Sequence, residues 1–80
     1  MEFDRTAVYR IRVLGRLDER WSERLGGLDL KICDEEPEQT ELTGSLADQA
    51  ALMGVLQYLY TRGISILRVE RLMPEDSPLP

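Results

Sequence analysis

The chain has 80 residues and a net charge of −5 at pH 7, with 42% hydrophobic and 31% charged residues. This composition is typical of a globular protein and excludes a disordered chain, and no apolar run is long enough to span a bilayer. A chain of this length forms one domain and buries only about 60 to 65% of its extended surface, so its core is thin and oligomerisation would add stability.

The acidic residues are concentrated between positions 29 and 48, where seven carboxylates stand against Lys31 alone. The acidic balance argues against non-specific binding to nucleic acid or to anionic membranes, so we predict neither as a partner. The first residues lack the apolar stretch of a signal peptide, and we therefore expect a cytoplasmic protein.

The residue types that carry most catalysis and metal binding are scarce in this chain. There is no histidine and only one cysteine, Cys33, which excludes histidine-based triads, an intrachain disulfide and four-cysteine zinc sites. We expect Cys33 to be a passive thiol, although Lys31 or an arginine could lower its pKa and make it reactive. The acidic run 34–38 lacks the spacing of a calcium-binding loop. We predict no enzyme activity, no cofactor and no metal site.

The first strand and the first helix are predicted within residues 6–25. Between residues 6 and 14, apolar side chains alternate with Arg10 and Arg12, which is the period of a half-buried strand. A helix of about two turns follows over residues 17–25, with Asp18 as its N-cap and two glycines after its end. Trp21 is expected to anchor this short helix to the domain.

A hairpin of two strands is predicted next. Residues 28–33 alternate with Leu28, Leu30 and Ile32 on the core face, and residues 39–46 alternate with Leu42 and Leu46 on the core face. The acidic, proline-containing segment 34–38 connects them.

The longest helix is predicted over residues 48–63. Asp48 is a favourable N-cap, and Ser45 gives an alternative capping-box start one turn earlier. Arg62 complements the negative end of the helix, and Gly63 suits the left-handed position after it. One face carries an apolar stripe at i, i+3, i+4 and i+7, formed by Leu52, Val55, Leu56 and Leu59.

The last strand is predicted over residues 64–72. Its alternation places Leu67 and Val69 toward the core and Arg68 and Glu70 on the opposite face. The domain is expected to cover residues 1–73, and the proline-rich residues 74–80 are expected to form a mobile tail.

The predicted order is strand, helix, strand, strand, helix, strand. The familiar arrangement for this order is an α+β, ferredoxin-like βαββαβ sandwich, in which a four-stranded antiparallel sheet of order 4-1-3-2 carries two helices on one face. A swapped or barrel-like dimer is the structural alternative.

Three segments of the chain carry a resemblance: YRIRVLGRLDERW at residues 9–21, LTGSLADQAALMGVL at residues 42–56 and LRVERL at residues 67–72. They are similar to a group of small, uncharacterised bacterial proteins. The shared LDERW and DQAAL motifs fit capped helix starts, and the resemblance implies no activity, ligand or site.

The outward face of the sheet is the first candidate interaction surface, because opposite charges from neighbouring strands can meet there. Its interpretations are a solvated face with weak cross-strand ion pairs, a surface for a partner or a second copy, and an anion site around the arginines. RNA binding is disfavoured, because the outward positions of the central strands carry no aromatic side chains. The predicted residues are Arg10, Arg12, Glu41, Arg68 and Glu70.

The long helix supplies a second candidate surface. Met53, Gly54 and Tyr60 lie away from its apolar stripe, and tyrosine and methionine are favoured at interfaces. The sequence therefore favours a non-catalytic interaction or oligomerisation module that binds itself or another protein. The alternative is a small-molecule-sensing regulatory domain that binds its ligand at a subunit interface, near the Gly15 turn and the Asp48 helix start.

Overall fold

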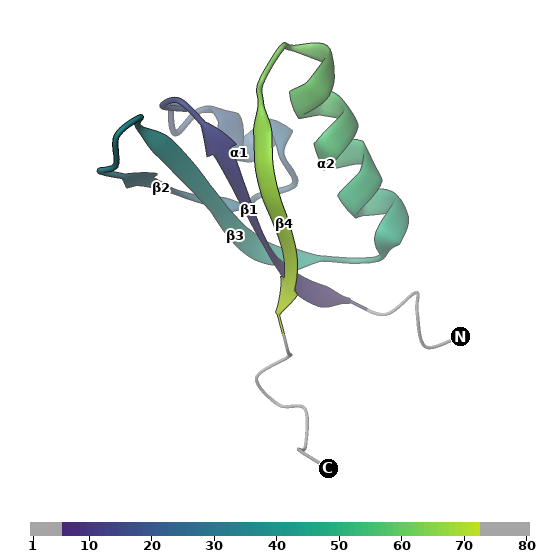
Figure 1. Cartoon of the computed structure of the whole chain (residues 1–80). Coiled ribbons are helices and arrows are strands. Elements are labelled where there is room, and N and C mark those ends of the chain that lie inside the picture. The colour runs from purple at the N-terminus through teal and green to yellow at the C-terminus, as the bar shows by residue number, and fades with distance from the viewer. Residues whose placement is uncertain (1–5, 73–80) are drawn as a thin grey trace.

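A computed structural model describes residues 6–72, which form a four-stranded antiparallel sheet and two helices (Figure 1). Residues 1–5 and the predicted proline-rich tail lie outside the described residues. Among the described residues, no helix is long and apolar enough to cross a membrane. The elements are β1 (Ala7–Leu14), α1 (Trp21–Arg24), β2 (Asp29–Cys33), β3 (Gln39–Leu46), α2 (Gln49–Thr61) and β4 (Ile66–Leu72).

The strands lie in the order β2-β3-β1-β4, and each neighbouring pair is antiparallel. Counted from the other edge, this is the predicted order 4-1-3-2, with β1 and β3 in the centre. Arg12 lies opposite Glu41 on β3, and Ile11 lies opposite Val69 on β4. Because side chains alternate between the two faces of a strand, these registers decide which charged residues meet.

The hydrophobic core lies between one face of the sheet and the helices. The rings of Trp21 and Tyr58 are in edge-to-face contact with centroids 6.0 Å apart, so α1 and α2 lie together on that face. The predicted core positions of β1 and β3 are buried, which confirms the alternation. The buried apolar residues are Ala7, Tyr9, Ile11, Val13, Leu17, Leu25, Leu28, Leu42, Leu46, Val55 and Leu59.

One polar side chain, Thr40, is fully buried within this core. Its hydroxyl accepts a hydrogen bond from the backbone N–H of Leu17 at 3.0 Å and donates one to the carbonyl of Gly15 at 2.7 Å. Both polar functions of the hydroxyl are therefore satisfied, and the connection between β1 and α1 is held against β3.

The ends of α2 agree with the sequence prediction. The Asp48 carboxylate accepts a hydrogen bond from the backbone N–H of Ala51 at 2.8 Å, which is an N-cap contact. Ser45 lies within β3, so the alternative capping-box start is wrong. At the other end Gly63 has a φ of 77°, the left-handed conformation that glycine adopts without strain.

The first helix is shorter than predicted. It contains only four residues, Trp21–Arg24, and Asp18 is not its N-cap. The Asp18 carboxylate instead accepts a hydrogen bond from the backbone N–H of Arg20 at 2.9 Å. This local turn competes with a helical start, so the chain becomes helical three residues after Asp18. Trp21 is half-buried and packs against Tyr58, as an anchor would.

The last strand differs from the prediction in two ways. It begins at Ile66, two residues later than predicted. Leu67 and Val69, predicted to face the core, are 48% and 41% exposed. The register with β1 shifts beside Leu67, between the pairs Arg12↔Arg68 and Val13↔Ile66. Val69 does face the helical side, opposite Ile11, but β4 is an edge strand and α2 leaves it partly uncovered.

Candidate interaction surface

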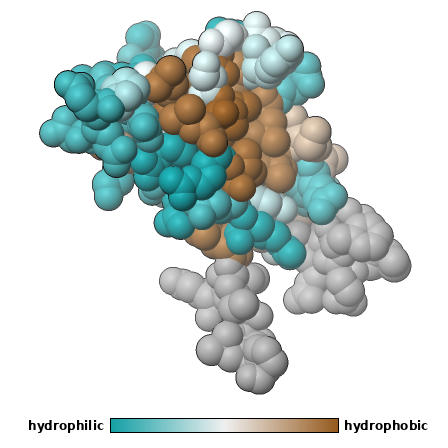
Figure 2. All heavy atoms as spheres, in the orientation of Figure 1, coloured by the Kyte–Doolittle hydropathy of each residue, from teal (hydrophilic) through white to brown (hydrophobic). Residues whose placement is uncertain are grey.

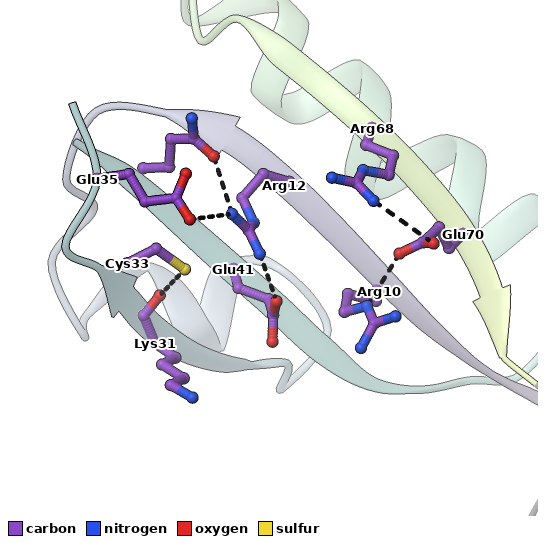
Figure 3. A network of polar contacts seen from close by, with 9 residues as sticks. Arg10, Arg12, Lys31, Cys33, Glu35, Glu41, Arg68 and Glu70 are labelled. Carbon is purple, nitrogen blue, oxygen red and sulfur yellow. Dashed lines mark hydrogen bonds and ion pairs between the residues drawn. The ribbon is translucent and has the colours of Figure 1, made fainter. Parts of the chain in front are cut away.

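The open face of the sheet, on the side away from the helices, carries a cluster of charged side chains from β1, β3 and β4 (Figure 3). They line a hollow of about 220 Å³. The structure therefore brings together all five charged residues that were predicted for this face: Arg10, Arg12, Glu41, Arg68 and Glu70.

Arg12 is the centre of the polar contacts nearer to β3. Its guanidinium donates hydrogen bonds to Glu41 Oε1 at 3.0 Å and to Gln39 Oε1 at 2.9 Å. The carboxylate of Glu35 lies 3.7 Å away, from the loop between β2 and β3. The hydrogen bond to Glu41 raises the pKa of Arg12, so this side chain stays charged. Both terminal nitrogens of the Arg12 guanidinium thus have acceptors, whereas its buried Nε has no hydrogen-bond partner among the described residues.

Glu70 on β4 is held mainly by Arg10. The Arg10 Nε donates a hydrogen bond to Glu70 Oε1 at 2.9 Å, while Arg68 lies 3.8 Å from Oε2 of the same carboxylate. The hydrogen bond from Arg10 is the main reason why the pKa of Glu70 is lowered. Glu70 is therefore ionised at neutral pH and is a poor proton acceptor.

Arg68 is the least well compensated charge of this cluster. It lies directly opposite Arg12 across the β1–β4 pair, and like charges in that position repel. Within the described part of the chain, Arg68 forms an ion pair with Glu70 at 3.8 Å. The same Glu70 carboxylate also accepts a hydrogen bond from Arg10. Its side chain is 62% exposed.

Cys33 lies at the outer edge of the same face and is half-buried. Its Sγ lies 3.9 Å from the backbone carbonyl of Lys31, a weak contact. Among residues 6–72, no three acidic or cysteine side chains come together in a way that could hold a metal ion.

The predicted residues on α2 form a separate surface. Met53 and Tyr60 are exposed large side chains, and a Cβ added at Gly54 would meet no atom within 4 Å. They lie on the helical side of the sheet, whereas the charged cluster lies on the open side. The predicted interaction residues therefore divide between two faces of the molecule.

An apolar surface that the sequence did not predict lies at β4. Figure 2 shows hydrophobic atoms gathered over β4 and the adjoining side of α2. The exposed apolar side chains of β4 are Leu67 and Val69. Alternation alone assigned both to the core, and no sequence signal reports how far a helix covers an edge strand.

Two polar partners of Arg12 were also missed. Gln39 lies two residues before Glu41 on the same strand, so it shares the outward face and is a diagonal neighbour of Arg12. The alternation of residues 39–46 was therefore sufficient to predict that Gln39 lies near Arg12. Glu35 lies in the loop between β2 and β3, where no periodic pattern indicates the direction of a side chain.

A second pocket, of about 300 Å³, lies between α1 and α2. The guanidinium of Arg62 stacks on the ring of Tyr58, with its central carbon 3.6 Å from the ring centroid. Arg20 donates a hydrogen bond to Asp18 at 3.1 Å. The lining residues are Asp18, Arg20, Trp21, Arg24 and Tyr58.

A family model described as a domain of unknown function, DUF8691, matches residues 8–70. The chain belongs to this family. The DUF8691 match covers nearly all of the described fold, from the second residue of β1 to Glu70 of β4. Comparisons with curated proteins and with solved structures gave no match. The match to a family of unknown function confirms the predicted resemblance to an uncharacterised group of proteins.

Proposed function

We propose that this DUF8691 protein is a non-catalytic interaction module that functions as a homo-oligomer. The observation that carries the proposal is the apolar surface of β4, where Leu67 and Val69 are exposed beside a strand edge that has no partner strand within residues 6–72. An exposed apolar edge strand is a template for pairing with another chain, and proteins usually cover such an edge. A small domain with a thin core also gains stability by association.

The absence of a catalytic role is part of the same proposal. The charged cluster pairs its carboxylates with arginines, and the lowered pKa of Glu70 makes this residue unsuited to general base catalysis near neutral pH. Fixed, paired charges suit recognition of a complementary protein surface.

We further propose that the fold is the ferredoxin-like sandwich and that the protein is bacterial and cytoplasmic. The strand order and the common side of the two helices support the fold assignment. A single free cysteine is compatible with a reducing compartment, and the resemblance of the LDERW and DQAAL motifs supports the bacterial origin.

The self-association is tested by light scattering coupled to gel filtration over a range of micromolar concentrations. We expect a mass of at least twice that of one chain, and Val69→Lys should lower it, because a charge at this position prevents burial of the apolar edge. Leu14→Lys is the matched control, since Leu14 is 39% exposed and Val69 is 41% exposed. A strictly monomeric mass for the unmodified protein would refute the proposal.

The second candidate, a small-molecule sensor, is favoured by the pocket between α1 and α2. Its volume of about 300 Å³ lies at the lower end of the range of ligand sites, and it combines two aromatic rings with arginines. This position differs from the predicted one near Gly15 and Asp48. A panel of small carboxylates should then raise the melting temperature of the unmodified protein but not that of Arg24→Gln. An unchanged melting temperature across the panel would count against a sensor.

A further inference from the structure

We infer that two copies of the chain join their β4 strands antiparallel about a twofold axis at Val69, which gives one continuous sheet of eight strands. This inference rests on the proposed self-association and adds the contact surface and its register. It is carried by the charge pattern of β4 together with the free edge of that strand.

The edge of β4 is available for another strand. Within the described part of the chain, β4 pairs with β1 only, so the backbone N–H and C=O groups on its other side have no strand partner. The strand contains seven residues, against five for β2 at the opposite edge. A strand of this length offers enough backbone groups for a specific antiparallel pairing.

The charges of β4 complement themselves in this register. A twofold axis at Val69 places residues at equal distances before and after it opposite each other. Arg68 then faces the partner's Glu70, and Glu70 faces the partner's Arg68. Each pair joins opposite charges directly across the two strands, which is the favourable arrangement on one face of a sheet.

The same register supplies what Arg68 lacks within one chain. Arg68 lies opposite Arg12 of its own sheet and 3.8 Å from Glu70, whose other oxygen is bound by Arg10. The partner's Glu70 would stand on the free side of Arg68. The row of side chains across the open face would then continue from Glu41 through Arg12 and Arg68 to a carboxylate of the second copy.

The apolar side of β4 is covered in the same contact. Val69 meets the partner's Val69 on the helical side of the sheet, and Leu67 lies opposite the partner's Arg71. The aliphatic part of an arginine can cover an apolar neighbour while its charged end remains in water. Part of the exposed apolar surface of Leu67 and Val69 is thereby removed from water in both copies.

The other edge of the sheet fits a second copy less well. The apolar residues of β2, Leu30 and Ile32, are already half-buried. Lys31 lies directly opposite Glu41 across the β2–β3 pair, so the residue that faces it is already of opposite charge. The least well compensated arginine of the cluster and the two exposed apolar side chains, Leu67 and Val69, both belong to β4.

Charge reversal tests the pairing. Arg68→Glu places a second carboxylate opposite the partner's Glu70, and the dissociation constant of the dimer should rise about tenfold. The same change puts a carboxylate opposite Arg12, which offsets the loss of the 3.8 Å contact between Arg68 and Glu70 in the monomer. Glu70→Arg should weaken the dimer similarly. An equimolar mixture of the two variants should form a heterodimer of nearly the original affinity, because both pairs are again opposite in charge.

The register is tested by cross-linking in a Cys33→Ser background. With Val69→Cys, the two introduced thiols lie directly opposite each other, and oxidation by copper phenanthroline should give a covalent dimer. With Arg71→Cys, the two thiols are offset by four positions along the strands, or about 13 Å, so cross-linking should be much weaker. Circular dichroism of each variant verifies that it is folded.

The outcomes separate this inference from the function on which it rests. A dimer that keeps its affinity in Arg68→Glu, or that cross-links equally well through both cysteines, overturns the β4 register but leaves self-association intact. A chain that is monomeric at every concentration overturns both. Restored affinity in the mixture of the two charge variants supports the contact through Arg68 and Glu70.

Discussion

Glu70 links the charged cluster to the pH dependence of stability. Its pKa is lowered, chiefly by the hydrogen bond from Arg10. A carboxylate of this kind stabilises the fold fully above its unfolded-state pKa, which is about 4.3, and the contribution is lost as the pH falls through the lower folded-state pKa. Acidification from pH 5 should therefore lower the melting temperature more in the unmodified protein than in Glu70→Gln.

The control for this pH profile is Arg10→Gln, which removes the donor and leaves the carboxylate. Its melting temperature should also depend less on pH below 5, because the pKa of Glu70 would return toward its ordinary value. Equal pH slopes in Glu70→Gln and in the unmodified protein would contradict the assignment of this acid sensitivity to the Arg10–Glu70 contact.

Alanine substitutions at Gly44 and Gly54 should have opposite effects on stability. A Cβ at Gly44 would lie 2.9 Å from Cδ2 and 3.4 Å from Cα of Leu28, whereas one at Gly54 would meet nothing within 4 Å. Gly44→Ala should lower the free energy of unfolding by about 1 to 3 kcal/mol through overpacking. Gly54→Ala should raise it by about 1 kcal/mol through helix propensity, as measured by urea denaturation.

Gly54→Ala also tests the candidate surface on α2 that includes Met53, Gly54 and Tyr60. The described chain places nothing against Gly54. If the variant lost self-association while its monomer became more stable, the outer face of α2 would be a contact surface, and pairing through β4 would not be the whole interface.

At the scale of elements, α2 depends on local signals at both ends. Asp48→Ala removes the hydrogen bond to the backbone N–H of Ala51, and it should lower the free energy of unfolding by about 1 kcal/mol. Asp48→Asn is the control, because an asparagine side chain can accept the same bond and should retain most of the stability. Thermal or urea unfolding measures both, and equal losses in the two variants would show that the hydrogen bond to Ala51 is not the source of the lost stability.

The other elements show where local signals stop being sufficient. The spacing of apolar residues over 17–25 predicts two turns of helix, yet only Trp21–Arg24 is helical, because the Asp18 carboxylate stabilises a turn. Leu17 and Leu25 are nevertheless buried. The spacing of apolar residues therefore predicted that Leu17 and Leu25 face the core. It did not predict the conformation of the chain between them.

At the scale of the whole molecule, the core lies on one face of the sheet and the other face is charged. The charged face satisfies most of its ions within one chain, and Arg68 at its edge is the exception. The helical face is incompletely covered at β4. Both features occur at the same edge of the molecule, so the proposed second copy at β4 would account for both.

The sequence by itself determined the order of the elements, the antiparallel sheet, the ends of α2 and the five charged residues of the open face. These depend on local chemistry and on the two-residue period of a strand, which a single chain displays directly. The outward position of Gln39 could have been predicted from the same two-residue period. The lack of histidine, which composition alone reveals, also removes the commonest general base at neutral pH.

Only the tertiary structure decided that β4 is an exposed apolar edge, that Glu35 approaches Arg12 and that Arg68 faces another arginine. Each depends on register, on the path of a loop or on how much of a strand a helix covers. Those quantities arise from contacts between segments far apart in the chain. Alternation could assign Leu67 and Val69 a face, but it could not report whether anything lay against that face.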